Sequence, residues 1–320
     1  MKAARVHRFG PSSVIQIEEV EKPQPEADQV LVEVHAAGVG PWDTWIRGGK
    51  SVLPQPLPLT LGSDFSGVVT AIGANVTSWS PGDEVFGITG PQYTGASAEY
   101  AAVPQTMLAH KPRGLSHVEA ASVPVVAVTA MQMLGEHARV VPGERVLILG
   151  AAGAVGAYAV QLARTSDVHV IGTVRRKDEV AYVRSLGAGE VVDVATARME
   201  DVVAPVEVVI DTVGGELANR SMALLSRGGR LVTAVPNPDQ ALAARYGVSA
   251  SFMLVDVRTE PLTRIAELFD KRELITNVGE VLPLSDIRAA HEMLERTRPH
   301  RRGKIVLALT SDAKQSPVAA

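Results

Sequence analysis

The sequence contains no cysteine, few aromatic residues and no long uninterrupted apolar run. Aromatic residues make up only 4% of its 320 residues. Without cysteine, the chain cannot form disulfides, thiolate metal sites or a cysteine nucleophile. No segment approaches the ~20 consecutive apolar residues that a membrane-spanning helix needs, and no apolar targeting segment follows Met1. We therefore expect a soluble, cytoplasmic protein without a membrane partner.

A strong charge of either sign is also absent. The formal charge is -4, which gives no broad attraction for nucleic acid. The one basic run, Arg296–Lys304, is typical of a solvated loop, with a phosphate contact as the alternative. The length and the 46% hydrophobic content are sufficient for two domains, each with its own core.

A glycine-rich turn near the middle of the chain carries the clearest signal. The apolar run Arg145–Leu149 predicts a buried strand, and Ala157–Ala163 has helical periodicity. Between them, glycines spaced three apart permit a tight turn and let backbone N–H groups approach a pyrophosphate. The predicted cofactor-binding residues here are Gly150, Gly153, Ala154, Val155 and Gly156. A purely structural turn is the alternative, but the strand–turn–helix context favours dinucleotide binding.

The residues before and after this turn differ in pattern. Short alternating segments predict a β-rich first part, with strands at 3–9, 15–20, 29–36, 61–73, around 81–87 and 98–104. Residues 38–49 are too irregular for a simple strand, and 119–134 has helical character interrupted by Pro124. Strands then alternate with helices, which predicts a doubly wound parallel sheet. Its strands are expected at 168–172, 190–194, 206–211, 229–235 and 249–255, and its helices at 177–186 and 216–225. Helices at 262–271 and 284–295, a strand at 303–309 and a frayed tail from Ser311 to Ala320 complete the prediction.

The end of the second strand indicates which nicotinamide cofactor is bound. An NAD site places an acidic residue here, about 20 residues beyond the glycines, for the ribose hydroxyls. This chain has Thr173, Val174, Arg175, Arg176 and Lys177 instead. The cations suit the 2′-phosphate of NADPH, and a guanidinium binds phosphate in a planar, bidentate way, which favours the two arginines. Thr173 offers a hydroxyl. A solvated basic helix start is the alternative.

Several motifs occur in an order that resembles a known family. They are Gly-Ser-Asp-Phe-Ser-Gly from Gly62, Pro81-Gly-Asp-Glu-Val, Ala98-Glu-Tyr, Glu119-Ala-Ala, the glycine turn, Asp211-Thr-Val-Gly-Gly and Gly303-Lys-Ile-Val. Over residues 1–309 the chain resembles medium-chain dehydrogenase/reductases of the zinc-free quinone oxidoreductase branch. The resemblance implies a GroES-like catalytic domain (1–122 and 258–320), a Rossmann domain (123–257), and an active site in the cleft between them. It also implies a homodimer joined through edge strands, here Ser249–Val255.

The same resemblance bears on metal and site residues. Zinc-dependent members carry histidine and cysteine at stretches that here read Gly38–Pro41 and Gly62–Asp64, so we expect no metal. The family pattern points to Asp43, Trp45 and Ser63 as catalytic or substrate-contacting. Trp42 and Trp45 are suited to stack flat aromatic acceptors, and Tyr93, in a glycine-rich loop, is a candidate proton donor if it faces the cleft. It also points to Gly40, Thr129, Ala234, Val235 and Lys304 beside the cofactor. Gly40 replaces a common asparagine, Trp45 a common tyrosine, and Val194 another tyrosine. Packing tryptophans, a surface tyrosine and a backbone-bonded threonine are the alternatives.

Without a metal or a cysteine, direct hydride transfer is the chemistry that remains. Quinones and α,β-unsaturated carbonyls suit it, because their reduction places negative charge on an oxygen that water or a hydroxyl donor can stabilise. Two alternatives stay open. One is an enoyl reductase acting on a thioester; the other is an NADPH-binding sensor or structural protein with little turnover.

Overall fold

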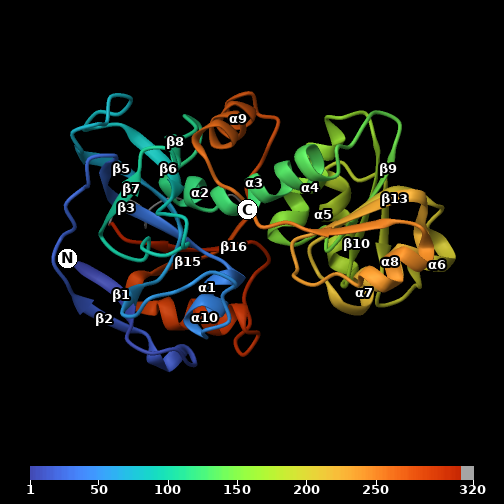
Figure 1. The fold of residues 1–320 in the computed structure, drawn as a ribbon, viewed down its shortest axis with the longest axis horizontal. Helices are drawn as coiled ribbons and strands as arrows, with labels where there is room; N and C mark the ends of the chain where they lie inside the picture. Colours follow the sequence, from blue (N-terminus) through green and yellow to red (C-terminus); the bar gives the residue numbers. More distant parts are fainter. Residues whose placement is uncertain (311–320) are drawn as a thin grey trace. The chain divides into compact units, whose positions relative to one another are not determined.

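The computed structural model describes residues 1–310. Its chain separates into two compact units, one formed by residues 1–125 with the described residues from 257 onward, the other by residues 126–256. Both units appear in Figure 1. The tail expected at 311–320 lies outside the described residues. Within the described part, no helix is both long and apolar enough to cross a bilayer.

The first unit is rich in strands, as its alternating sequence pattern predicts. A small sheet has the order β2-β1-β4, and a larger one has the order β15-β16-β3-β5-β6-β8, with β7 paired to β3. Its strands are β1 (Lys2–Val6), β2 (Gln16–Glu19), β3 (Gln29–Val39), β4 (Leu59–Thr60), β5 (Asp64–Ile72), β6 (Glu84–Ile88), β7 (Tyr100–Pro104), β8 (Leu108–His110), β15 (Val278–Pro283) and β16 (Lys304–Ala308). Its helices are η1 (Ser12–Val14), α1 (Pro41–Arg47), α2 (His117–Ala121), α9 (Thr259–Asp270), η5 (Leu284–Asp286) and α10 (Ile287–Leu294).

The second unit confirms the predicted parallel sheet. Six strands lie in the order β11-β10-β9-β12-β13-β14, and each neighbouring pair is parallel. They are β9 (Arg145–Leu149), β10 (His169–Val174), β11 (Glu190–Asp193), β12 (Val206–Asp211), β13 (Leu225–Thr233) and β14 (Ser249–Phe252). The helical segments are η2 (Met133–His137), α4 (Ala154–Arg164), η3 (Lys177–Glu179), α5 (Val180–Ser185), α6 (Met199–Val202), α7 (Gly215–Ser221), η4 (Met222–Leu224) and α8 (Gln240–Tyr246). Helix α3 (Pro124–Gln132) crosses the boundary between the units.

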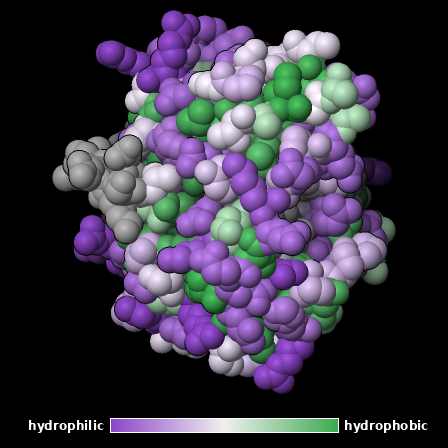
Figure 2. Space-filling view, turned by 90° about the vertical axis from the view of Figure 1, so that its left-hand side faces the viewer, coloured by the Kyte–Doolittle hydropathy of each residue, from purple (hydrophilic) through white to green (hydrophobic). Residues whose placement is uncertain are grey.

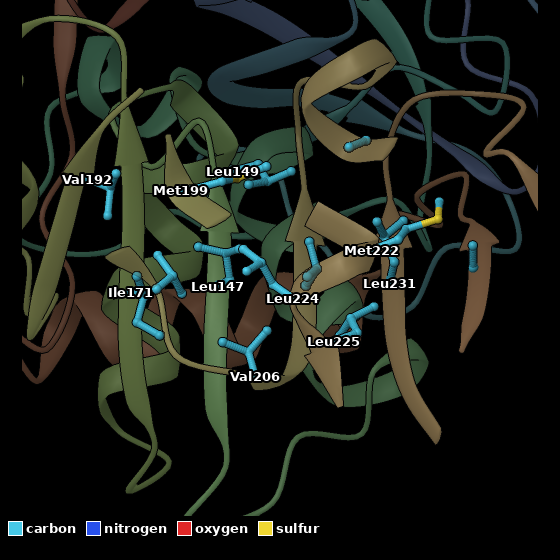
Figure 3. Close-up of a cluster of buried hydrophobic side chains, with 14 of the residues drawn as sticks. Leu147, Leu149, Ile171, Val192, Met199, Val206, Met222, Leu224, Leu225 and Leu231 are labelled. Carbon is cyan, nitrogen blue, oxygen red and sulfur yellow. The ribbon is translucent and has the colours of Figure 1, made fainter. Parts of the chain in front are cut away.

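Apolar side chains from neighbouring strands form the core of the second unit. Leu147 and Leu149 on β9, Ile171 on β10 and Leu231 on β13 are fully buried (Figure 3). Parallel strands covered on both faces need such continuous apolar runs. Figure 2 shows an outer face of the first unit, where hydrophilic residues predominate and hydrophobic ones lie in small groups.

The structure corrects some expected elements. The irregular stretch 38–49 contains helix α1, which begins at Pro41 with Gly40 as its cap; proline at the first helical position already has a suitable φ. Pro124 likewise begins α3 and separates it from α2. The strand expected at 249–255 ends at Phe252, and Leu254 is exposed. Short elements such as α6, α8, β4, β8 and β15 were not predicted.

Candidate functional site

The glycine turn leads from β9 into α4. Gly150 has a φ of 75°, a conformation that favours glycine. A Cβ at Gly156 would lie 2.2 Å from the Gly150 carbonyl oxygen, so the helix packs against the turn only with glycine there. Gly153 and Ala154 are exposed at the helix start. The first N–H groups of α4 lack intrahelical acceptors, and with the helix dipole they form a place for an anionic phosphate.

Thr173 and the cations after β10 lie in different surroundings. Thr173 is buried, and its hydroxyl oxygen accepts the Gly150 N–H at 3.1 Å, so it supports the turn. Arg175, Arg176 and Lys177 are exposed. Arg176 donates to Asp178 at 2.9 Å, and this hydrogen bond raises the pKa of its guanidinium. Within residues 1–310, the side chains of Arg175 and Lys177 have no such partner.

A buried carboxylate organises the loops after β12 and β13. Asp211 accepts the N–H groups of Val213 and Gly214, both at 2.9 Å, and the hydroxyl of Thr233 at 2.6 Å. The Thr233 oxygen in turn accepts the Val235 N–H at 2.9 Å, and Ala234 N–H bonds to the Asp211 carbonyl at 3.0 Å. The predicted Ala234 and Val235 therefore belong to a loop at the carboxyl ends of the strands, where ligands of parallel sheets bind.

The first unit contains a buried cluster of charged side chains. Lys304 donates to Asp64 at 2.7 Å, with the lysine 4% and the aspartate 0% exposed. Asp64 also accepts the Val125 N–H at 3.0 Å. Burial raises the pKa of the Asp64 carboxyl, against the lowering effects of Lys304 and the Val125 N–H. Lys304, a predicted cofactor contact, is thus ion-paired inside its own unit.

Asp43 lies in the same electrostatic environment. Its side chain is 1% exposed, and one carboxylate oxygen accepts the Gly40 N–H at 2.7 Å. The other oxygen has no hydrogen-bond partner among residues 1–310. Burial raises the pKa of Asp43 to about 7, while the Gly40 N–H and the Lys304 ammonium lower it. Asp43 therefore caps the first turn of helix α1 through the Gly40 N–H, and its carboxyl has a pKa of about 7.

Trp42 and Ser63 are hydrogen-bonded to each other next to this cluster. The indole Nε1–H of Trp42 donates to the Ser63 hydroxyl at 3.0 Å, and Lys304 Nζ lies 4.2 Å from the indole centroid. Trp42 is partly exposed, whereas Ser63 is fully buried. Two sequence segments that the family resemblance picked out separately, 40–47 and 62–64, are thereby brought into contact.

The remaining predicted residues differ in exposure. Trp45 is 46% exposed, so it does not simply pack the first unit. Tyr93 is 9% exposed and has a φ of 59°, an uncommon value outside glycine; it is not a surface tyrosine. Thr129 is buried within α3. The roles of all three stay predictions.

The comparisons with known proteins agree with this architecture. Residues 26–113 match the family "Alcohol dehydrogenase GroES-like domain", and residues 186–307 match "Zinc-binding dehydrogenase". Quinone oxidoreductase of Pongo abelii is 31% identical over 308 residues, covering 91% of this chain and 93% of the relative. The quinone oxidoreductase structure from Coxiella burnetii has a TM-score of 0.89 and 33% identity, covering 97% of this chain and 99% of its own.

The chain belongs to the medium-chain dehydrogenase/reductase family, in its quinone oxidoreductase branch. It is an oxidoreductase that uses a nicotinamide cofactor. The Escherichia coli quinone oxidoreductase complexed with NADPH has a TM-score of 0.86 and 25% identity, covering 96% of this chain and 100% of its own. The predicted GroES-like and Rossmann architecture is confirmed.

A zinc ion does not fit the donor set of this medium-chain dehydrogenase/reductase. Zinc sites need converging cysteine, histidine or carboxylate ligands. Among the described residues, no group of three or more such side chains is placed to hold a metal. The buried carboxylate of Asp64 faces the Lys304 ammonium instead, and Ser63 accepts a hydrogen bond from Trp42.

Sequence reasoning assigned no site role to Asp211 or Asp64, which organise these sites. Asp211 belongs to a motif that carries the resemblance, but no site role follows from the motif alone. Asp64 and Lys304 lie in separate motifs 240 residues apart, and their pairing is visible only in the fold. The signal available beforehand was that each is a charged residue at the end of an apolar strand.

Proposed function

We propose that this chain transfers a hydride from NADPH to quinones or α,β-unsaturated carbonyls without zinc. The observation that carries the cofactor preference is the end of β10, where exposed Arg175, Arg176 and Lys177 take the place of the acid that NAD requires. The glycine turn and the free N–H groups of α4 support pyrophosphate binding there. The acceptor class is supported by relatives named quinone oxidoreductases.

Bound NADPH would supply the hydride, and the side chains of the first unit would bind and orient the acceptor. Ser63 accepts a hydrogen bond from Trp42, and its own hydroxyl hydrogen has no acceptor among residues 1–310. That hydrogen suits the oxygen that becomes negative as the acceptor is reduced. The proton that completes the reaction would come from Tyr93 or from water. Trp45 would contact the acceptor through its exposed surface.

The remaining parts of the proposal follow the resemblance. We propose a cytoplasmic homodimer that pairs through β14, because this strand lies at the edge of the six-stranded sheet and an unpaired edge favours pairing with a second copy. We also propose that Gly40, Thr129, Ala234 and Val235 lie beside the cofactor. The domain assignment proposed is catalytic for residues 1–122 and 258–320, and cofactor-binding for 123–257.

Cofactor titration followed by turnover tests this proposal. NADPH and NADH are titrated by fluorescence, and nucleotide consumption is then followed with 1,4-benzoquinone, 9,10-phenanthrenequinone and cyclohexenone. We expect preferential NADPH binding that an Arg175→Ala/Arg176→Ala variant loses, and saturable turnover in the parent. Arg184→Ala, which removes an exposed arginine from α5, is the matched control. Equal affinity for both nucleotides would contradict the NADPH assignment, and tight NADPH binding without turnover would favour the sensor alternative.

A further inference from the structure

Trp42 occupies space that a side chain at position 40 would need. A Cβ added to Gly40 would lie 2.3, 2.4 and 2.5 Å from three consecutive atoms of the six-membered ring of Trp42. Real Cβ atoms do not approach other heavy atoms this closely, because carbon atoms in van der Waals contact are at least about 3.5 Å apart. The indole therefore lies directly against the Gly40 backbone, and glycine at position 40 is a condition for this placement.

The indole is also held from two other directions. Its Nε1–H donates to Ser63 at 3.0 Å, and Lys304 Nζ stands 4.2 Å from the ring centroid, a cation–π distance. Lys304 is itself fixed by its ion pair with buried Asp64. A side chain with three such contacts loses little entropy when an acceptor binds, so it forms a rigid wall rather than a mobile cover.

Polar groups with spare hydrogen-bonding capacity lie close to this wall. Ser63 is fully buried and retains a hydroxyl hydrogen that has no acceptor among the described residues. Asp43, beside Trp42 in the chain, has one buried carboxylate oxygen without a partner. Because Ser63 is buried and the indole is hydrogen-bonded to its hydroxyl, an acceptor oxygen gains access to this hydroxyl only by passing along the indole or displacing it. The size of the acceptor is thereby limited by the position of Trp42.

We propose that Trp42 determines acceptor size, with Gly40 as the residue that makes room for it. The inference rests on the proposed function and adds to it a substrate class: small single-ring quinones and short enones are preferred over fused tricyclic quinones. The indole takes the space of a side chain at position 40 and restricts the approach to Ser63. Removing the indole would open that space to a larger ring system.

The first test compares 1,4-benzoquinone with 9,10-phenanthrenequinone in Trp42→Ala and Trp42→Phe. For Trp42→Ala we expect the kcat/KM ratio to shift toward the larger quinone by at least about 10-fold, the scale of discrimination that a pocket wall supplies. The shift should arise mainly in KM for the larger quinone, with the Kd for NADPH unchanged. Trp42→Phe retains most of the ring and should keep the ratio within about 2-fold of the parent.

A control variant separates this effect from a general loss of aromatic surface. Phe9→Ala removes an exposed aromatic side chain from the same unit and should leave the ratio of the two quinones unchanged. If Trp42→Ala also leaves the ratio unchanged while the parent turns over both quinones, the inference is overturned and the proposed function stands. If the parent turns over neither quinone, the proposed function fails first.

The second test measures the steric coupling of positions 40 and 42 directly. Gly40→Asn alone should lower Tm markedly, because the new Cβ meets the indole at 2.3 Å. In Gly40→Asn/Trp42→Ala the indole is gone, and most of the lost Tm should return. A Gly40→Asn variant that keeps the parent Tm, or a double variant no more stable than the single one, would overturn the packing on which the inference depends.

Discussion

The candidate sites of the two units are built from different parts of the chain. In the second unit, the backbone forms the site: glycines shape the turn before α4, and the cations at the end of β10 face solvent. In the first unit, side chains form it: Asp43, Asp64 and Lys304 are nearly inaccessible to solvent. The difference matters because backbone N–H groups carry fixed partial charges, whereas buried side-chain charges depend on partners for their stability.

Replacement of Lys304 in the first unit should have the largest effect on the free energy of unfolding. Lys304→Met would leave the buried Asp64 carboxylate without its cation, which typically costs about 3–5 kcal/mol in the free energy of unfolding. Urea denaturation measures this loss, and Lys271→Met, at an exposed lysine, is the control. The Asp64→Asn/Lys304→Met variant should recover much of the stability. If Lys304→Met weakens NADPH binding at unchanged stability, the lysine serves the cofactor rather than the cluster.

The second-largest expected effect is a pH dependence of the free energy of unfolding that arises from Asp43 in the first unit. Asp43 has a pKa raised from 3.8 to about 7 in the folded chain, so the folded state binds this proton more tightly than the unfolded state. Its contribution therefore favours folding most at low pH and is lost as the pH rises from about 4 to about 7. We expect Asp43→Asn to remove this fall, which amounts to at most about 4 kcal/mol. Denaturation midpoints measured from pH 4.5 to 7.5 report this fall in stability. If Asp43→Asn shows the same fall as the parent, the fall arises from another group. Asp201→Asn, at an exposed aspartate, is the control.

In the second unit, a steric clash at Gly156 should lower the free energy of unfolding by a smaller amount. Gly156→Ala would place a Cβ 2.2 Å from the Gly150 carbonyl oxygen, and we expect about 1–3 kcal/mol of destabilisation together with weaker nucleotide binding. Gly153→Ala is the matched control, since its Cβ would meet the same oxygen at 3.1 Å. Thermal unfolding and fluorescence titration test both variants. Equal effects at the two glycines would contradict the close packing of α4 against the turn.

The smallest expected effects concern the exposed cations. Arg175→Ala should weaken NADPH binding by about 10-fold, the loss of one charge-assisted hydrogen bond, and should leave NADH binding unchanged. Arg176→Ala should do less, because Arg176 already pairs with Asp178. Titration of both nucleotides into each variant decides between them. A larger effect at Arg176 than at Arg175 would show that the Asp178 pair opens to receive the phosphate.

The predicted elements agree with the structure where local patterns and backbone requirements coincide. Continuous apolar runs predicted β9 and β12 in the parallel sheet, and the glycine spacing located the start of α4. Short elements such as β8 and α6 were missed, because segments of 3 or 4 residues carry too little periodicity to distinguish them from loops. Helix α1 was missed because the glycines on both sides of it and the two tryptophans within it obscured the Pro41 start signal.

The sequence by itself determined the fold class, the glycine turn and the cationic end of β10, because each depends on residues that are neighbours in the chain. Only the tertiary structure decided that Lys304 meets Asp64, that Trp42 packs on Gly40 and bonds Ser63, and that Thr173 supports Gly150. Burial and hydrogen bonding between distant segments depend on how strands pair and helices pack, and no local pattern encodes that arrangement.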